Sequence, residues 1–365
     1  MGGTQRAMVN LAHGLVELGL EVELYASLKK EHFFHLDPRI QFSEAPKRVR
    51  HPVALTISLL TNIRKIAKKS EAQTIIVFDN FYNAVTLLAT WGLKKRVFVS
   101  DRVSPFHHYA WYVKLFTRIL FFMIKPAGII AQTSDSAKYQ RQRFGKKVPV
   151  EVIPNPVKEM KSYDCQRETI VLAVGRLQDP LKGFDRLIEA WGRINATGWR
   201  LETNGPKEIK RFQAGKMETE GWRLVFAGGL EADNPDLGKR AGELGVYETI
   251  DFLGKVQNMD ELYAKASIFV MPSRSEGFPN ALLEAMCAGL ACISFDFVAG
   301  PKDIITDNVN GLLVANNDIE ALAKSINELI HNPVLRTSLG NEAAKLSASY
   351  SLQAITKRLC DFMSC

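Results

Sequence analysis

Two carboxylates around a glycine-containing turn give this sequence its strongest chemical signal. Glu276 precedes Gly277 and Phe278, and Glu284 follows eight residues later in a segment with helical spacing. Ionised carboxylates make strong hydrogen bonds to paired hydroxyls, which suits a ribose or another sugar. The N–H groups of Gly277, Phe278 and Asn280, together with the positive end of a helix dipole, suit an electron-rich ligand. The alternative is that Glu276 is a solvated loop residue and Glu284 a surface helix charge.

The elements that position these residues can be predicted from the apolar runs around them. Ile268–Met271 and Leu290–Phe295 are short apolar runs typical of buried parallel strands. Between them, Pro279 suits the first helical position, and Gly289 suits the left-handed residue just past the last helical turn. The sequence therefore predicts a strand, a turn, a helix and a second strand.

A second loop carries fixed positive charge. The predicted strand Ile170–Val174 ends at Gly175, and Arg176 and Lys182 follow on the same loop. Glycine lets the backbone approach a ligand closely, and a guanidinium and an ammonium on one loop can converge on a diphosphate.

The segment Glu276-Gly-Phe-Pro-Asn-Ala-Leu-Leu-Glu284, followed by Ala285-Met-Cys-Ala-Gly289, resembles the signature of glycosyltransferase family 4. These are the group 1 glycosyltransferases, retaining enzymes of the GT-B fold, and the resemblance is to the members that build bacterial cell-surface glycans. It implies an α/β chain with two Rossmann-like domains facing across a cleft. By the same resemblance, Glu284 holds the donor ribose, Glu276 and the amides after it hold hydroxyls of the transferred sugar, and Arg176 and Lys182 bind the pyrophosphate.

Further donor contacts follow from the resemblance. Gly254-Lys255-Val256 matches the loop that meets the nucleobase through backbone atoms, and Gly300 stands at another strand end where amides could contact the diphosphate. On the acceptor side, Ser100-Asp101-Arg102 resembles the Ser-Glu-Arg stretch of the family. Asp101 is expected to orient or deprotonate the acceptor hydroxyl and Arg102 to pair with a phosphate, whereas the alternative is an internal ion pair between them.

The start of the chain departs from the family pattern. Gly2 and Gly3 match a family loop on the acceptor side that follows the first strand of the N-terminal sheet, but here they open directly into an amphipathic helix, Ala7–Leu18. We therefore expect an N-terminal sheet without its first strand. A misplaced start, a truncation or a sheet completed in another way would each explain this. Separately, Gly198-Trp-Arg-Leu201 is echoed at Gly221-Trp-Arg-Leu224, which indicates an insertion.

Length and composition fit a two-domain enzyme. The 365 residues suit an acceptor-side domain over 1–157, a nucleotide-sugar domain over 158–340, and a C-terminal helical segment, 341–365, that returns to the first domain. Five cysteines without metal spacing indicate reduced thiols in a cytoplasmic protein. The net charge of +8 favours anionic partners, but the basic residues form no recognisable nucleic-acid module.

The segment Phe106–Lys125 mixes aromatic residues with Lys114, Arg118 and Lys125. This composition fits an interfacial membrane helix at the inner face of the membrane, and it fits equally a buried helix with a basic rim. His107 and His108 lack a Cys or acidic partner at metal spacing, so no metal is assigned.

The expected function is transfer of a hexose or N-acetylhexosamine from a nucleotide sugar, with UDP as the expected nucleotide, to a glycan or a polyprenyl-linked acceptor. No cofactor or metal is expected, because Arg176, Lys182 and helix-end amides can stabilise the leaving diphosphate. The alternatives are a sugar-nucleotide epimerase of the same fold and an inactive, membrane-associated scaffold that still binds nucleotide.

Overall fold

The computed structural model describes residues 3–26, 35–45, 51–100, 102, 111–160, 163, 165–197, 221–298 and 300–364. The chain divides into unit 1, Met1–Lys158 with Ala348–Cys365, and unit 2, Glu159–Ser347. The boundary expected at 340/341 lies at 347/348, because helix α11 (Pro333–Ala344) still packs against elements of unit 2. Asp101, Gly2 and the insertion at 198–220 lie outside the described residues.

Unit 2 is built on a six-stranded parallel sheet in the order β12-β11-β10-β7-β8-β9. The four residues of β10 are all buried, as expected of a strand covered on both faces. The strand order reverses between β7 and β10, which is the doubly wound Rossmann-like arrangement. The strands are β7 (Ile170–Val174), β8 (Arg223–Ala227), β9 (Ile250–Phe252), β10 (Ile268–Met271), β11 (Ala291–Asp296) and β12 (Leu312–Ala315).

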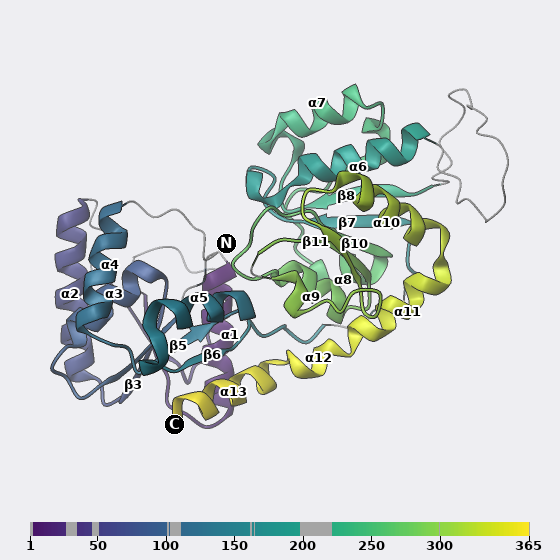
Figure 1. Cartoon of the computed structure of the whole chain (residues 1–365). Helices are drawn as coiled ribbons and strands as arrows, with labels where there is room; N and C mark the ends of the chain where they lie inside the picture. The colour runs from purple at the N-terminus through teal and green to yellow at the C-terminus, as the bar shows by residue number, and fades with distance from the viewer. Residues whose placement is uncertain are drawn as a thin grey trace. The chain divides into compact units, whose positions relative to one another are not determined.

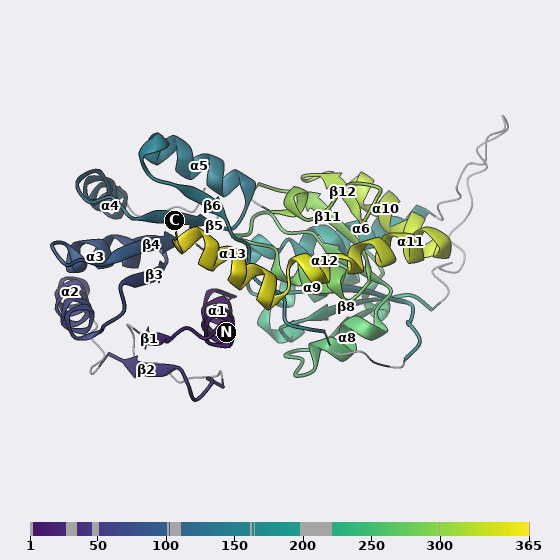
Figure 2. The same ribbon diagram turned by 90° about the horizontal axis from the view of Figure 1, so that it is seen from below.

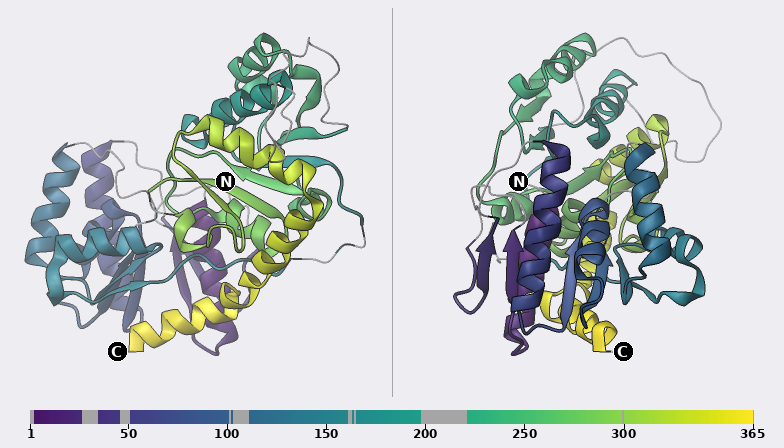
Figure 3. Two further views of the ribbon diagram at one scale, coloured as in Figure 1. Left: turned by 45° about the vertical axis from the view of Figure 1, so that its right-hand side comes forward. Right: turned by 90° about the vertical axis from the view of Figure 1, so that its left-hand side faces the viewer.

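Helices cover both faces of this sheet, as Figures 1 and 3 show. Helices α6 and α10 pack on each other and α7 joins them, whereas α9 and α11 pack together on β11. The helices are α6 (Phe184–Thr197), α7 (Pro235–Glu243), α8 (Met259–Lys265), α9 (Asn280–Cys287) and α10 (Ile319–His331), with α12 (Leu346–Ser349) after α11.

Helix α9, which carries Glu284, has defined signals at both ends. Pro279 is the residue that precedes the helix, so its prediction as the first helical residue is wrong by one position. At the other end Gly289 has φ +75°, its N–H donates to Met286 O, and Leu290 N–H donates to Ala285 O. This Schellman arrangement ends the helix and returns the chain into β11.

Unit 1 contains two separate parallel sheets, β1-β2 and β3-β4-β5-β6. Among the described residues no strand joins β1 to β3. Helix α1 begins at Gly3, four residues before the predicted start, so Gly3 is helical. The strands are β1 (Glu23–Ala26), β2 (Gln41–Glu44), β3 (Thr74–Phe78), β4 (Arg96–Ser100), β5 (Gly128–Ala131) and β6 (Val150–Val152).

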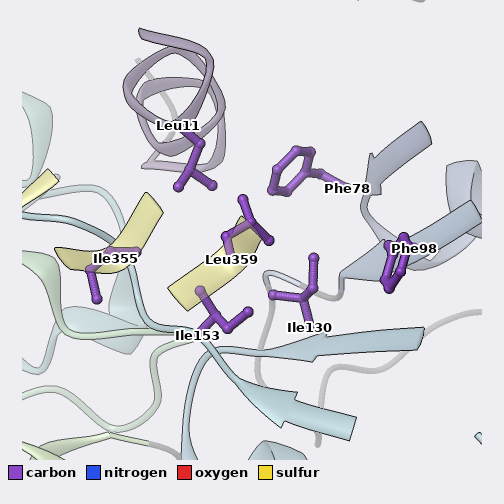
Figure 4. Packing of buried hydrophobic residues seen from close by; sticks show 7 residues of the cluster. All are labelled: Leu11, Phe78, Phe98, Ile130, Ile153, Ile355 and Leu359. Carbon is purple, nitrogen blue, oxygen red and sulfur yellow. The ribbon is translucent and has the colours of Figure 1, made fainter. Parts of the chain in front are cut away.

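Two apolar clusters pack on the two faces of the four-stranded sheet. Figure 4 shows the first, in which α1 and α13 meet the strands through Leu11, Phe78, Phe98, Ile130, Ile153, Ile355 and Leu359. Val97, Val99 and Ile129 point to the opposite face, because successive side chains of a strand alternate. There α3, α4 and α5 cover the sheet, and α2, α3 and α4 lie side by side (Figure 2). The helices are α1 (Gly3–Glu17), α2 (Pro52–Lys69), α3 (Asn80–Thr90), α4 (Trp111–Met123), α5 (Ser134–Phe144) and α13 (Leu352–Ser364).

Candidate active site

The loops after β7 and β10 meet at the point where the strand order of unit 2 reverses. In doubly wound sheets ligands bind at this point, in the crevice outside the carboxyl ends of the strands. Lys182 Nζ, from the first loop, lies 2.7 Å from Glu276 Oε1, from the second. Ser273 Oγ donates to the same carboxylate oxygen at 2.8 Å. The side chains of Lys182 and Glu276 are only 19% and 14% exposed, so this pair is held in a partly desolvated position.

A second set of contacts fastens the two loops together. The Arg274 guanidinium donates to both carboxylate oxygens of Asp185, at 2.8 and 2.5 Å, and its backbone N–H donates to Leu181 O. The hydrogen bonds from Arg274 lower the pKa of Asp185 below its usual value. Gly183 has φ +68°, and a Cβ placed there would lie 2.1 Å from Pro272 O. Glycine is therefore required at 183 both by its conformation and by the approach of the other loop.

Arg176 lies on the same loop as Lys182 but has a different partner. Its Nη2 donates to Asp179 Oδ2 at 2.7 Å, and its side chain is 70% exposed. Asp179 also accepts from Leu181 N–H, which caps the short helical turn Pro180–Lys182. Arg176 and Lys182 were predicted to converge on one point. In the structure they have different partners, Asp179 for Arg176 and Glu276 for Lys182.

The start of α9 supplies backbone donors next to Glu276. Among the described residues the N–H groups of Gly277, Phe278, Ala281 and Leu282 have no hydrogen-bond partner. The N–H of Asn280 was expected to be available as well, but it donates to Phe278 O at 2.9 Å. The chain makes a tight turn there before the helix begins, and the turn uses this donor.

Glu284 lies one turn into α9 and is partly buried. Its Oε2 accepts a hydrogen bond from the Tyr263 hydroxyl, on α8, at 3.1 Å. The carboxylate is therefore oriented by a neighbouring helix and is not a solvated surface charge. Tyr263 was missed in the sequence, because the two residues come from different helices and share no local pattern.

The remaining predicted donor residues lie at carboxyl ends of strands in the same sheet. A Cβ on Gly175 would lie 3.0 Å from Lys182 Cδ, and one on Gly300 would lie 3.1 Å from Pro279 Cδ, so both glycines adjoin this site. Val256 is partly buried on the loop after β9, two residues beyond Gly254 with its φ of +69°. Sequence reasoning missed Ser273, although its position three residues before Glu276 was a usable signal.

The acceptor-side prediction is only partly within the described residues. Arg102 is buried, follows β4 and donates from Nη1 to Asn155 Oδ1. Its guanidinium carbon lies 4.5 Å from the centroid of the Phe78 ring. The predicted alternative, an ion pair with Asp101, involves a residue outside the described part of the chain.

Unit 2 also contains a cavity of about 210 Å³ against the segment before β7, lined by Met160, Tyr163, Cys165, Arg167, Asp260, Ala264 and Ala288. Its cation, Arg167, donates to four backbone carbonyls, those of Tyr263, Ala266, Ala288 and Gly289. The guanidinium is therefore engaged in joining the ends of α8 and α9. This cavity offers no charge for a diphosphate, in contrast to the Lys182–Glu276 site.

Comparison with known proteins bears on this site. Residues 158–346 match the family described as glycosyl transferases group 1, and residues 1–159 match glycosyltransferase family 4. A curated relative from Campylobacter jejuni is 27% identical over 97% of this chain and 92% of its own length. It is named as an α-1,4-N-acetyl-D-galactosaminyltransferase acting on GalNAc-α-(1->4)-GalNAc-α-(1->3)-diNAcBac-PP-undecaprenol.

Two solved structures share the fold. Sucrose-phosphate synthase from Thermosynechococcus elongatus has a TM-score of 0.77 at 17% identity, with 100% of this chain and 93% of that chain covered. Anabaena HepE in complex with UDP has a TM-score of 0.74 at 15% identity, with 100% and 96% covered. The family match spans more than half of the chain and includes the whole Lys182–Glu276 site. The chain belongs to the group 1 glycosyl transferases and is a glycosyltransferase of the GT-B fold.

Proposed function

We propose that this enzyme transfers a hexose or N-acetylhexosamine from a UDP-sugar to a glycan or lipid-linked glycan, with retention of anomeric configuration. The observation that carries the proposal is the Lys182–Glu276 pair at the strand-order reversal, next to the unpaired amides of Gly277 and Phe278. Near its scissile bond a sugar nucleotide has a negatively charged diphosphate and a hydroxylated sugar. The cation and the backbone donors suit the diphosphate, and the carboxylate suits the sugar hydroxyls.

The proposed role of Lys182 is to stabilise the leaving diphosphate. Its ammonium is held by Glu276. In this proposal, donor binding exchanges that carboxylate partner for phosphate oxygens. Fixed positive charge in a partly dry site stabilises developing negative charge strongly. Arg176, whose partner Asp179 is on a solvent-exposed loop, is proposed to turn to the same diphosphate. This stabilisation needs no metal ion.

Glu276 is then free to accept hydrogen bonds from hydroxyls of the transferred sugar, while Ser273 holds its orientation. Glu284, oriented by Tyr263, is proposed to accept from the ribose hydroxyls. In this proposal Glu276 positions the sugar and forms no covalent bond to it. The acceptor hydroxyl attacks from the face that the diphosphate leaves, which retains the anomeric configuration.

The proposed acceptor class rests on the relatives. The Campylobacter relative is named for a diphospho-undecaprenol-linked glycan, and a 35% identical Escherichia coli relative, matched over 36% of this chain, is named as a lipopolysaccharide 1,6-galactosyltransferase. Both names refer to a glycan joined to a lipid, which supports a glycan or lipid-linked glycan as the acceptor class.

Contact with a membrane surface is part of the proposal, supported by helix α4. Trp111, Leu115, Ile119 and Phe122 recur at helical spacing and are 50–85% exposed, while Leu120 and Phe121 are buried. In the part of the chain that the structure describes, no helix has the length and hydropathy of a membrane-spanning segment. An exposed apolar stripe on a helix that also carries Arg118 suits the interface of an anionic bilayer.

Sedimentation with anionic and neutral vesicles tests this contact. Trp111→Ser with Phe122→Ser should reduce binding to anionic vesicles, while Val334→Ser, at an exposed position in unit 2, should not. Equal sedimentation of all three proteins, or none of the native protein, would contradict the membrane role.

The transfer proposal is tested by calorimetry with UDP and GDP and by acceptor-dependent release of UDP from a panel of UDP-sugars. The proposal expects UDP binding and release only with acceptor, and the product's anomeric configuration by NMR should match that of the donor. Donor turnover without acceptor would instead indicate an epimerase, and nucleotide binding without any turnover would indicate a scaffold.

A further inference from the structure

Buried polar side chains line the carboxyl edge of the four-stranded sheet in unit 1. Arg102 follows β4, Gln132 follows β5 and Asn155 lies three residues after β6; all three are more than nine-tenths buried. Because β4, β5 and β6 are parallel neighbours, the segments that leave them emerge at one edge. The structure therefore gathers a guanidinium and two amides there from three separate strands.

The contacts around Arg102 fix it from two sides. Its Nη1 donates to Asn155 Oδ1, and Gln132 Nε2 donates to the same oxygen at 2.8 Å. The guanidinium carbon lies 4.5 Å from the centroid of the Phe78 ring, within the range of a cation–π contact. Both restraints act on one end and one face of the guanidinium, so its orientation is set before any ligand arrives.

The edge of the guanidinium formed by Nε and Nη2 takes part in neither hydrogen bond. Arg102 Nε and Nη2 are buried and have no hydrogen-bond partner among the described residues. No described carboxylate forms an ion pair with Arg102, and burial lowers the pKa of Arg102 to about 9. A buried cation without a counter-charge is costly, and such a group is usually compensated by an anion.

We propose that the Nε and Nη2 edge of Arg102 binds an anionic group of the acceptor substrate, either a phosphate or a sugar carboxylate. These two N–H groups are parallel and coplanar, which matches the two oxygens of such a group in a bidentate pair. The Arg102 guanidinium is held in place by three positioning residues, Asn155, Gln132 and Phe78. Both nitrogens are buried, so binding must be accompanied by a local opening. This inference rests on the proposed glycosyl transfer, and it specifies the charge that the acceptor carries.

The experiment compares pairs of acceptors in which one member carries an anionic group that the other lacks. One pair is N-acetylgalactosamine on a short prenyl diphosphate and the same sugar as a neutral prenyl glycoside; the other is the prenyl glycoside of glucuronic acid and that of glucose. The native enzyme should prefer one charged member over its neutral counterpart by about 10- to 100-fold in kcat/KM. A preference in the first pair identifies a phosphate, and a preference in the second identifies a carboxylate.

The Arg102→Met variant should lose this preference through a higher KM for the charged acceptor, while its affinity for UDP stays unchanged. Arg102→Lys, which keeps the charge and loses the fork, should recover only part of it. The idea is overturned if the native enzyme uses charged and neutral acceptors equally, or if folded Arg102→Met keeps the full preference. The comparison of charged and neutral acceptors with the native enzyme tests the proposal even if Arg102→Met does not fold. UDP binding and sugar transfer without charge preference would reject this inference alone, whereas absence of both would reject the proposed function.

Discussion

Lys182 Nζ and Glu276 Oε1 are 2.7 Å apart, although they are 94 residues apart in the chain. They are brought together because β7 and β10 are neighbours at the reversal of strand order, so their following loops leave the same edge of the sheet. The two charges compensate each other. In the proposed donor complex the diphosphate replaces Glu276 as the partner of Lys182, and hydroxyls of the sugar replace Lys182 as the partner of Glu276.

Replacement of Lys182 by Ala should lower kcat by about 100-fold or more, because it removes a charge aimed at the leaving diphosphate. The matched control is Lys265→Ala, which removes a lysine paired with Glu261 on α8 before the amino end of β10. Steady-state release of UDP measures both variants. Turnover near that of the native enzyme in Lys182→Ala would show that Lys182 does not contact the leaving group.

Glu276→Gln should separate nucleotide binding from sugar transfer. The change frees Lys182 from its carboxylate partner, so UDP should bind at least as tightly as before by calorimetry. Turnover should fall by about 10-fold or more, because a neutral amide makes weaker hydrogen bonds to sugar hydroxyls than a carboxylate. Glu261→Gln serves as the control. Weaker UDP binding in Glu276→Gln would contradict the view that the carboxylate competes with the diphosphate for Lys182.

Glu284→Ala should raise the Kd for UDP by about 10- to 100-fold, the usual loss for hydrogen bonds to an ionised group. Tyr263→Phe should have a smaller effect, since it removes only the hydroxyl that orients the carboxylate. The 2′,3′-dideoxy analogue of UDP tests the ribose role directly. It should bind the native protein and Glu284→Ala with equal affinity; a difference would place the effect of Glu284 elsewhere.

Gly183→Ala should destabilise unit 2 and weaken UDP binding, because the added Cβ meets Pro272 O and forces the two site loops apart. Gly245→Ala is the matched control: its φ of +69° is equally unfavourable for alanine, but no atom lies within 4 Å of the added Cβ. Chemical denaturation and calorimetry compare the two. If both variants lost the same stability and the same UDP affinity, the close approach of Gly183 to Pro272 would contribute nothing to either property.

Local sequence patterns determined most of the secondary structure. The strands Ile170–Val174 and Ile268–Met271 have the predicted bounds. Apolar runs bounded by turn residues define such strands whatever lies around them. The family signature at Glu276–Glu284 likewise needed only neighbouring residues, and it predicted the transferase class that the comparisons establish.

Tertiary structure decided which charges are paired. The order of residues placed Arg176 and Lys182 on one loop. Whether they converge depended on two carboxylates: Asp179, which pairs with Arg176 and caps the turn Pro180–Lys182, and Glu276, which follows a different strand and pairs with Lys182. The orientation of Glu284 by Tyr263 and the isolated edge of Arg102 were equally beyond local reading. Hydrogen bonds and ion pairs act over a few ångströms of space, and only the fold determines which distant residues come within that range.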